Sequence, residues 1–180
     1  MKCPVHLSFL GEPFVFGEFK VLFLHGLSSD GSRKSAYLRF LGYDVLTPRL
    51  ADWSFRSAMR TARNACDEFE PDVIVGSSRG GAVAMALARS GVPLVLLAPA
   101  WRWCGVPPRV SAPQAVVIHS PSDRWVRLDD SVELCRQNPH VRLIAAGDGH
   151  RLNDPAARAA LADVLDDLFP TKEKRADADR

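Results

Sequence analysis

The chain has 180 residues, 47% of them hydrophobic and 24% charged, which fits a single globular domain with one core. Its formal net charge of +2 gives no strong attraction to nucleic acid or to an acidic membrane, so we expect neither as a partner. The four cysteines have no C-x-x-C or metal-ligand spacing, so we expect reduced thiols rather than a disulfide framework, and no metal site. They are Cys3, Cys66, Cys104 and Cys135.

The first residues do not match a secretory signal peptide. Lys2 gives a thin basic region, and the short apolar run at 5–10 is interrupted by Gly11, Glu12 and Pro13 without a clear cleavage site. No stretch approaches the length needed to span a bilayer. We therefore expect the protein in the cytoplasm.

Short, continuous hydrophobic segments predict strands, and they alternate with segments that predict helices. The predicted strands are 20–24, 43–47, 72–76, 93–97, 114–119 and 141–145. The predicted helices are 35–41, 54–70, 79–90, 128–137 and 155–169. The segment 98–113 holds four of the thirteen prolines and two tryptophans, so we expect it to be irregular.

This alternation of hydrophobic strands and helices predicts an α/β fold, with a doubly wound, mostly parallel sheet flanked by helices. We assign residues 1–170 to this single domain and 171–180 to a charged, disordered tail. Whether the segment before residue 20 adds a strand or a hairpin stays open. Because ligands of such sheets bind at the carboxyl ends of the strands, functional side chains should directly follow strands.

The segment Gly-Ser-Ser-Arg-Gly at 76–80 matches G-x-S-x-G between a predicted strand and a predicted helix. A serine hydroxyl can project from so tight a turn only if the backbone is strained there, and Gly76 and Gly80 remove Cβ atoms that would collide. We therefore predict Ser78 as a nucleophile, the alternative being a purely structural glycine turn. A dinucleotide-binding loop would need glycine at 78, and a P-loop would need Gly-Lys before Ser or Thr, so nucleotide binding is disfavoured.

A serine hydroxyl needs a base at neutral pH. The chain has five histidines, and His150 alone lies in a glycine-rich loop between the last predicted strand and the last predicted helix. It also follows Ser78 in the chain, as the order Ser, Asp, His of this kind of site requires. We predict His150 as the base, although a surface loop histidine would have the same surroundings in sequence.

The orienting acid is predicted to be Asp123, which follows the strand at 114–119. A carboxylate there can hold the imidazole in one tautomer and stabilise its cation. Asp129, Asp130 and Asp148 are alternatives. Helix capping accounts for the first two, and Asp148 can serve to shape its own loop.

An oxyanion needs two hydrogen-bond donors, which we predict to be the backbone N–H groups of Leu27 and Arg79. Gly26 allows the sharp turn that presents Leu27. The side chains of His25 and His119, both at strand ends, are expected to be packed and hydrogen-bonded rather than reactive.

Tryptophans mostly follow the predicted strand ends and could line an apolar acyl or alcohol pocket. Ordinary packing explains each of them nearly as well. The residues concerned are Trp53, Trp101, Trp103 and Trp125.

The order of four motifs resembles the α/β-hydrolase superfamily, and in particular its small, lid-poor bacterial YqiA-like esterases. The motifs are HGLSS at 25–29, GSSRGG at 76–81, HSPSDRWV at 119–126 and GDGHRL at 147–152. The resemblance runs from about residue 20 to 168. It implies triad positions for Ser78, Asp123 and His150, acyl hydrolysis without a cofactor, and minimal or no cap, since 98–113 is the only candidate cover.

The sequence therefore predicts a serine hydrolase that cleaves small carboxylic esters through an acyl-enzyme, with a small-molecule ester as its partner. Thioesterase, lactonase or peptidase chemistry at the same site stays open. So does a non-catalytic binding protein on a hydrolase fold, although the intact set of Ser, Asp and His argues against it. The sequence predicts no oligomeric state.

Overall fold

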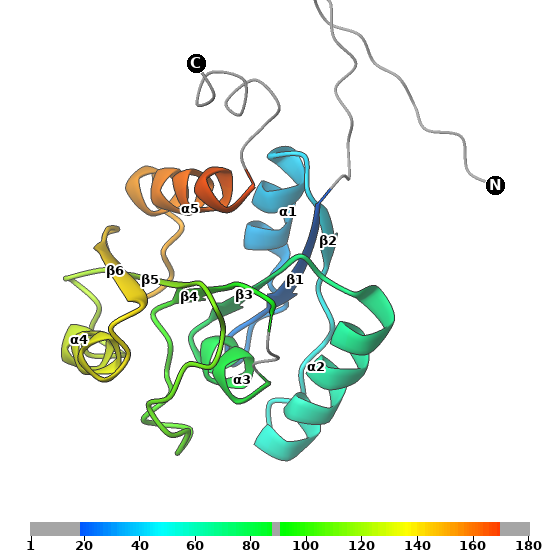
Figure 1. The fold of residues 1–180 in the computed structure, drawn as a ribbon, viewed down its shortest axis with the longest axis horizontal. Helices are drawn as coiled ribbons and strands as arrows, with labels where there is room; N and C mark the ends of the chain where they lie inside the picture. Colours follow the sequence, from blue (N-terminus) through cyan, green and yellow to red (C-terminus); the bar gives the residue numbers. More distant parts are fainter. Residues whose placement is uncertain (1–18, 88–90, 170–180) are drawn as a thin grey trace, which may run out of the picture.

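The computed structural model describes residues 19–87 and 91–169, and within them the chain forms one parallel sheet between two layers of helices (Figure 1). The strands are β1 (Lys20–Leu24), β2 (Asp44–Leu46), β3 (Val73–Ser77), β4 (Leu94–Leu97), β5 (Ala115–His119) and β6 (Val141–Ala145). The helices are α1 (Ser32–Phe40), α2 (Phe55–Phe69), α3 (Arg79–Leu87), α4 (Leu128–Gln137) and α5 (Pro155–Leu168).

The strand order is β2-β1-β3-β4-β5-β6, and every neighbouring pair is parallel. The chain first moves from β1 to one side and then returns to place β3 on the other side of β1. The sheet therefore has its switch point between β1 and β3, where Leu24 pairs with Gly76. The loops after these two strands lie side by side at that crevice, which is the usual ligand site of such a sheet.

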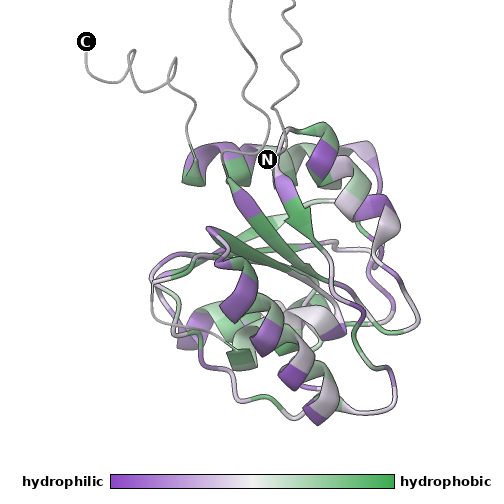
Figure 2. Ribbon diagram, turned by 90° about the vertical axis from the view of Figure 1, so that its right-hand side faces the viewer, coloured by the Kyte–Doolittle hydropathy of each residue, from purple (hydrophilic) through white to green (hydrophobic). Residues whose placement is uncertain are grey.

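Alternate residues of each strand enter two separate hydrophobic clusters, one on each face of the sheet. In β1, for example, Leu22 and Leu24 pack with α2 and α3, whereas Val21 and Phe23 pack with α1 and α5. Figure 2 shows the hydrophobic strands between helices whose outer sides carry hydrophilic residues. Because both faces are covered, the inner strands are almost wholly apolar, and the predicted doubly wound α/β sheet is confirmed.

The predicted elements are all found, with shifts at some ends. The helix predicted from residue 35 begins at Ser32, because Gly31 takes a left-handed conformation (φ 72°) and its carbonyl accepts the first helical bond from the Ser35 N–H. Ser54 caps α2 by accepting a bond from the Ser57 N–H at 3.1 Å. The segment 98–113 contains no helix or strand, as predicted.

Several predictions from sequence lie outside the described residues. They are the strand or hairpin before residue 20, the last turn of the helix predicted at 79–90, and the tail at 171–180. No helix in the described part is both long and apolar enough to cross a bilayer. No cap covers the carboxyl edge of the sheet in the described ranges.

Candidate active site

The turn between β3 and α3, called the elbow below, has the tight strand-to-helix geometry that the G-x-S-x-G pattern predicts. Ser78 stands alone between the two elements with φ at 56°, a left-handed conformation that non-glycine residues rarely adopt. Its backbone N–H donates to the Leu97 carbonyl at 2.8 Å, and its own carbonyl accepts from the Ala100 N–H at 3.0 Å. These bonds to the neighbouring strand end hold the strained residue in place.

Two glycines make this turn sterically possible. A Cβ at Gly80 would lie 2.0 Å from the Leu24 carbonyl oxygen, and one at Gly76 would lie 2.7 Å from the Gly80 carbonyl oxygen. No side chain fits at such distances, so helix α3 can approach β1 only with glycine at these positions. The pattern is thus required by backbone packing around Ser78.

Ser78, His150 and Asp123 come from three different strand ends and form one chain of hydrogen bonds. The Ser78 Oγ lies 2.9 Å from His150 Nε2, and His150 Nδ1 lies 2.7 Å from Asp123 Oδ2. Because a carboxylate only accepts, Nδ1 carries the proton, and Nε2 is left to accept from the serine hydroxyl. This tautomer lets the imidazole receive a proton from Ser78.

The Asp123 side chain is fully buried, and its two oxygens have separate partners. Oδ1 accepts from the backbone N–H groups of Trp125 at 2.8 Å and Val126 at 3.0 Å. Oδ2 faces His150. The turn that the segment S-P-S-D predicts therefore also supplies the hydrogen-bond donors that the buried carboxylate needs.

The three alternative acids are engaged elsewhere. Asp129 is exposed and pairs with a neighbouring arginine at 2.6 Å, and Asp130 accepts from Arg102 at 2.7 Å. Asp148 lies in the loop of the histidine, where its N–H donates at 3.2 Å to the carboxylate that caps α5. Among the described contacts, the carboxylate that meets the imidazole is that of Asp123.

The loop that carries His150 is anchored from two sides. The Ser120 hydroxyl, at the end of β5, donates to a carbonyl of the loop at 2.8 Å. From α1, the Lys34 ammonium donates to the Arg151 carbonyl and, at 3.0 Å, to Asn153 Oδ1. Lys34 could not be predicted as part of the site, because no local pattern links it to a loop 117 residues away along the chain.

The loop after β1 is held against the elbow by His25. The ring of this buried residue accepts from the Leu50 N–H at Nε2, 3.0 Å away, so its Nδ1–H donates to the Gly26 carbonyl at 2.8 Å. A Cβ at Gly26 would lie 3.2 Å from Ser78 Cβ and 3.7 Å from Ser78 Oγ. His25 is thus packed and hydrogen-bonded, as predicted, and it fixes the backbone that adjoins the serine.

The two predicted oxyanion donors belong to residues that follow Gly26 and Ser78 in the chain. Leu27 follows Gly26 in the loop beside the serine, and Arg79 is the first residue of α3, whose N–H has no acceptor within its own helix. Neither backbone N–H takes part in the turn and loop hydrogen bonds that the structure describes. The N–H of Arg79 lies at the positive end of the α3 dipole, and the role of both groups as oxyanion donors stays a prediction.

The Arg79 side chain contacts the loop after β2 and the start of α2. Its Nη2 donates to the Ala51 carbonyl at 2.8 Å, and its Cζ lies 5.8 Å from the centre of the Phe55 ring. The residue is only 8% exposed, and Nη1 is buried without a hydrogen-bond partner. The charge of Arg79 lowers the pKa of the Cys104 thiol, but burial has the larger effect and raises it. The thiolate of Cys104 is therefore disfavoured.

Three of the four tryptophans are open to solvent and follow strand ends. Trp53 is 88% exposed, Trp103 71% and Trp125 70%. The Trp125 ring stacks on that of His150, and the residue before Trp53, Asp52, accepts from a backbone N–H of the loop after β1 at 3.2 Å. The structure therefore brings Trp125 to the site and leaves Trp53 beside the neighbouring loop.

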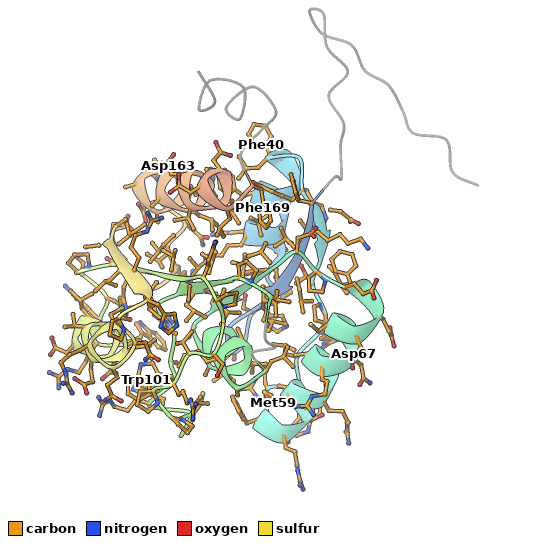
Figure 3. The ribbon with its side chains drawn as sticks, in the orientation of Figure 1. Phe40, Met59, Asp67, Trp101, Asp163 and Phe169 are labelled. Atoms are coloured by element: carbon orange, nitrogen blue, oxygen red, sulfur yellow. The ribbon has the colours of Figure 1, made fainter. Side chains whose placement is uncertain are left out.

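Trp101 differs from the other three, because it is 5% exposed and belongs to the hydrophobic core. Its indole N–H donates to the Asp130 carbonyl at 3.1 Å, which fixes the irregular segment against α4 (Figure 3). It shares with Trp103 the lining of a hollow between that segment and α4. The packing alternative, rather than substrate binding, explains Trp101.

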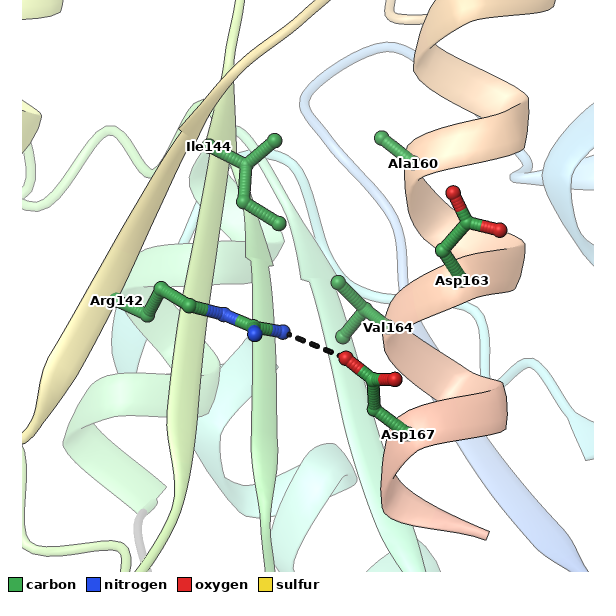
Figure 4. A pocket seen from close by; sticks show the side chains of 6 residues that line it. All are labelled: Arg142, Ile144, Ala160, Asp163, Val164 and Asp167. Atoms are coloured by element: carbon green, nitrogen blue, oxygen red, sulfur yellow. Dashed lines mark hydrogen bonds and ion pairs between the residues drawn. The ribbon is translucent and has the colours of Figure 1, made fainter. Parts of the chain in front are cut away.

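Another hollow lies between the edge strand β6 and α5, as Figure 4 shows. Its lining includes Arg142, which pairs with Asp167 across it at 3.1 Å, and the apolar side chains of Ile144 and Val164. None of the predicted site residues lines it. The chemistry therefore gathers at the carboxyl edge of the sheet and not in this hollow.

Comparison with known proteins agrees with this architecture. A model of the alpha/beta hydrolase family matches residues 21–178, so the chain belongs to this family. A search of the curated proteins gives no match. The narrower resemblance to YqiA-like esterases stays a prediction.

Solved structures share the fold at low sequence identity. A serine hydrolase from the bacterium Cycloclasticus zankles is 15% identical with a TM-score of 0.66, over 88% of this chain and 93% of that one. Esterase PE8 is 16% identical with a TM-score of 0.61, over 86% and 94%. Alpha/beta hydrolase domain-containing protein 10 from mouse is 15% identical with a TM-score of 0.66, over 83% and 89%.

Proposed function

We propose that this protein is a serine hydrolase that cleaves small carboxylic esters, with Ser78 as nucleophile, His150 as base and Asp123 as its orienting acid. The observation that carries the proposal is the continuous hydrogen-bond chain, 2.9 Å from Ser78 Oγ to His150 Nε2 and 2.7 Å from His150 Nδ1 to Asp123 Oδ2. Membership of the hydrolase family supports it, as does the shared fold with an esterase and a serine hydrolase.

The proposed reaction has two acyl-transfer steps. His150 takes the Ser78 proton as the serine oxygen attacks the ester carbonyl, and the imidazolium is stabilised by Asp123. The tetrahedral intermediate collapses when His150 gives its proton to the leaving alcohol, which leaves an acyl-enzyme. Water, deprotonated by the same histidine, then attacks the acyl carbon and frees the acid and the serine.

The negative charge that develops on the carbonyl oxygen is proposed to rest on the backbone N–H groups of Leu27 and Arg79. Each such donor contributes roughly a hundredfold to a thousandfold in kcat in related chemistry. The positive end of the α3 dipole adds to this field. All these groups belong to the chain itself, so the proposed reaction needs no cofactor.

We propose that the favoured esters carry an apolar or aromatic group. Four exposed large apolar side chains follow the carboxyl ends of different strands: Leu27 after β1, Trp53 after β2, Trp103 after β4 and Trp125 after β5. Because parallel strands end at one edge of the sheet, and no cap covers these side chains in the described residues, we propose that they form an open apolar rim rather than an enclosed pocket. Such a rim favours small esters with limited selectivity.

The experiment that tests the proposal is labelling with a fluorophosphonate probe, with the modified residue identified by mass spectrometry. The wild type should be labelled at Ser78 and should hydrolyse a short p-nitrophenyl ester. Ser78→Ala should lose both properties, because no other hydroxyl is paired with His150 among the described bonds. Ser77→Ala is the matched control, and it should keep both.

Full hydrolysis by Ser78→Ala would refute the assignment, and a wild type that neither labels nor hydrolyses would favour a binding protein on the hydrolase fold. A panel of thioesters, lactones and amides at equal concentration distinguishes the other chemistries of the same site. We expect the carboxylic esters to react fastest. We expect a small-molecule substrate in the cytoplasm, with no nucleic-acid or membrane partner.

A further inference from the structure

A second histidine, His119 at the end of β5, contacts the Asp123 carboxylate of the candidate triad. It is fully buried, and both ring nitrogens have partners. Nδ1 lies 2.7 Å from the Ser131 hydroxyl on α4, and Nε2 lies 3.1 Å from the Val126 carbonyl and 3.3 Å from Asp123 Oδ2. The ring thus touches the same carboxylate oxygen that faces His150.

These partners fix the protonation of the His119 ring. Around Nε2 stand only acceptors, a carbonyl and a carboxylate, so Nε2 carries a proton. At Nδ1 the Ser131 hydroxyl can donate, which lets Nδ1 stay without a proton. Burial lowers the pKa of His119 below its ordinary value of 6.5, although the bond to Val126 and the charge of Asp123 oppose this shift. The ring is therefore neutral, with its N–H directed at the segment that holds the acid.

Val126 connects His119 to Asp123 through its backbone. Its N–H donates to Asp123 Oδ1 at 3.0 Å, while its carbonyl accepts from His119. The loop 120–126 is thereby closed on itself around the carboxylate, with the imidazole of His119 as the inner support. A neutral ring suits this place, because an imidazolium 3.3 Å from Asp123 Oδ2 would compete for the charge that His150 needs.

We propose that His119, held by Ser131, is a positioning residue for the Asp123 carboxylate in the hydrolytic reaction. This inference rests on the proposed function of Ser78, His150 and Asp123. The N–H of His119 fixes Val126 and contacts Oδ2, so the carboxylate stays aligned with the Nδ1–H of His150 when that ring becomes charged. Hydrogen bonds, together with the 3.3 Å contact between His119 and Asp123, connect Ser78 through both histidines to Ser131 on α4.

The test compares two substitutions of one side chain. His119→Leu removes the N–H and leaves the buried Val126 carbonyl without a donor, whereas His119→Gln places an amide N–H near the former Nε2 position. We expect His119→Leu to lower kcat by about tenfold to a hundredfold, because misplacing a reacting group by about 1 Å has effects of that size. KM should change little, since His119 touches no substrate.

We expect His119→Gln to recover most of the lost kcat. Ser131→Ala should cause a smaller loss in the same direction, because the Nε2–H remains. In proton NMR spectra, the far-downfield resonance of the proton between His150 and Asp123 should shift or broaden in His119→Leu. In His119→Gln it should return to its wild-type position. A purely structural role would not move that resonance in the folded protein.

Asn138→Leu is the matched control for burial. Asn138 is also a buried polar residue, at the other end of α4, and it bonds to the segment at 108–110 rather than to the site. It should lower stability but leave kcat per folded molecule and the resonance unchanged. If His119→Leu and Asn138→Leu had the same effect on kcat and on the resonance, the inference would be overturned.

Ser78→Ala, assayed alongside, separates the two claims. If it retains hydrolysis, the proposed function itself fails. If it is inactive while His119→Leu keeps the wild-type kcat, only the role of His119 fails.

Discussion

The rings of Trp125 and His150 are stacked, with their centroids 6.1 Å apart and their planes inclined at 17°. Trp125 remains 70% exposed, while the His150 side chain is 19% exposed. The indole therefore lies beside the imidazole in an offset stack and still presents most of its surface to solvent at the open site. Its backbone N–H also donates to Asp123, so one residue touches both the base and the acid.

Trp125→Ala should reduce kcat/KM for an aromatic ester by about threefold to tenfold, because an aromatic contact of this kind contributes about 0.5–1.5 kcal/mol. The loss should be smaller for an aliphatic ester of equal leaving group. Trp125→Phe should keep most of the rate, since it keeps a flat ring. Both variants keep the backbone N–H to Asp123, so equal losses for the two esters would show that Trp125 does not contact substrate.

Asp123→Asn should lower kcat by about ten-thousandfold. The two backbone N–H groups at Oδ1 select the amide oxygen, which turns the amide NH₂ toward His150. An N–H at that place forces Nδ1 to accept, so the His150 proton moves to Nε2 and the ring cannot take the proton of Ser78. Steady-state kinetics with the folded variant measures the loss.

Asp129→Asn is the control for this substitution, because Asp129 is exposed, pairs with Arg127 and is one of the alternatives that the sequence left open. It should keep the wild-type kcat. If Asp129→Asn were impaired and Asp123→Asn active, the acid would be assigned to the wrong loop.

Much of the fold was predictable because strand cores and helix ends are encoded locally. The runs at 20–24 and 141–145 each hold four hydrophobic residues out of five, and the predicted bounds match β1 and β6. Positions directly after strands also predicted which side chains meet at the sheet edge, because all six strands run in one direction. The chain of bonds from Ser78 to Asp123 follows from that parallel arrangement.

Contacts set by distant segments could not be predicted. Trp101 has the same sequence surroundings as an exposed tryptophan, and only α4 packing over it decides that it is buried. Arg79 shows the same limit, because its side chain direction depends on the Ala51 carbonyl in another loop. The neutral tautomer of His119 depends on Ser131, which no spacing rule connects to it.

Gly80→Ala should destabilise the fold by more than about 3 kcal/mol, because the added Cβ would lie 2.0 Å from a backbone oxygen that cannot move without displacing β1. Gly149→Ala is the control, since a Cβ there meets nothing within 4 Å. Urea unfolding of both variants measures the difference. A Gly80→Ala protein as stable as Gly149→Ala would mean that α3 does not pack against β1 in this way.

Lys34 should make stability rise with pH in an alkaline window. Burial, with smaller effects from Arg158 and Arg151, lowers the pKa of its ammonium from 10.5 to about 8. Between those values the unfolded chain binds a proton that the folded chain has released, so the free energy of unfolding contributed by Lys34 increases with pH and is constant below about pH 8. Lys34→Met lacks this group, so urea unfolding at about pH 7.5 and about pH 10 should show the wild type gaining stability relative to the variant at the higher pH.

Since the folded amine also holds the Arg151 carbonyl beside His150, the variant should lose some kcat as well. An unchanged difference in stability between the two pH values would mean that the ammonium is solvated and does not anchor the loop.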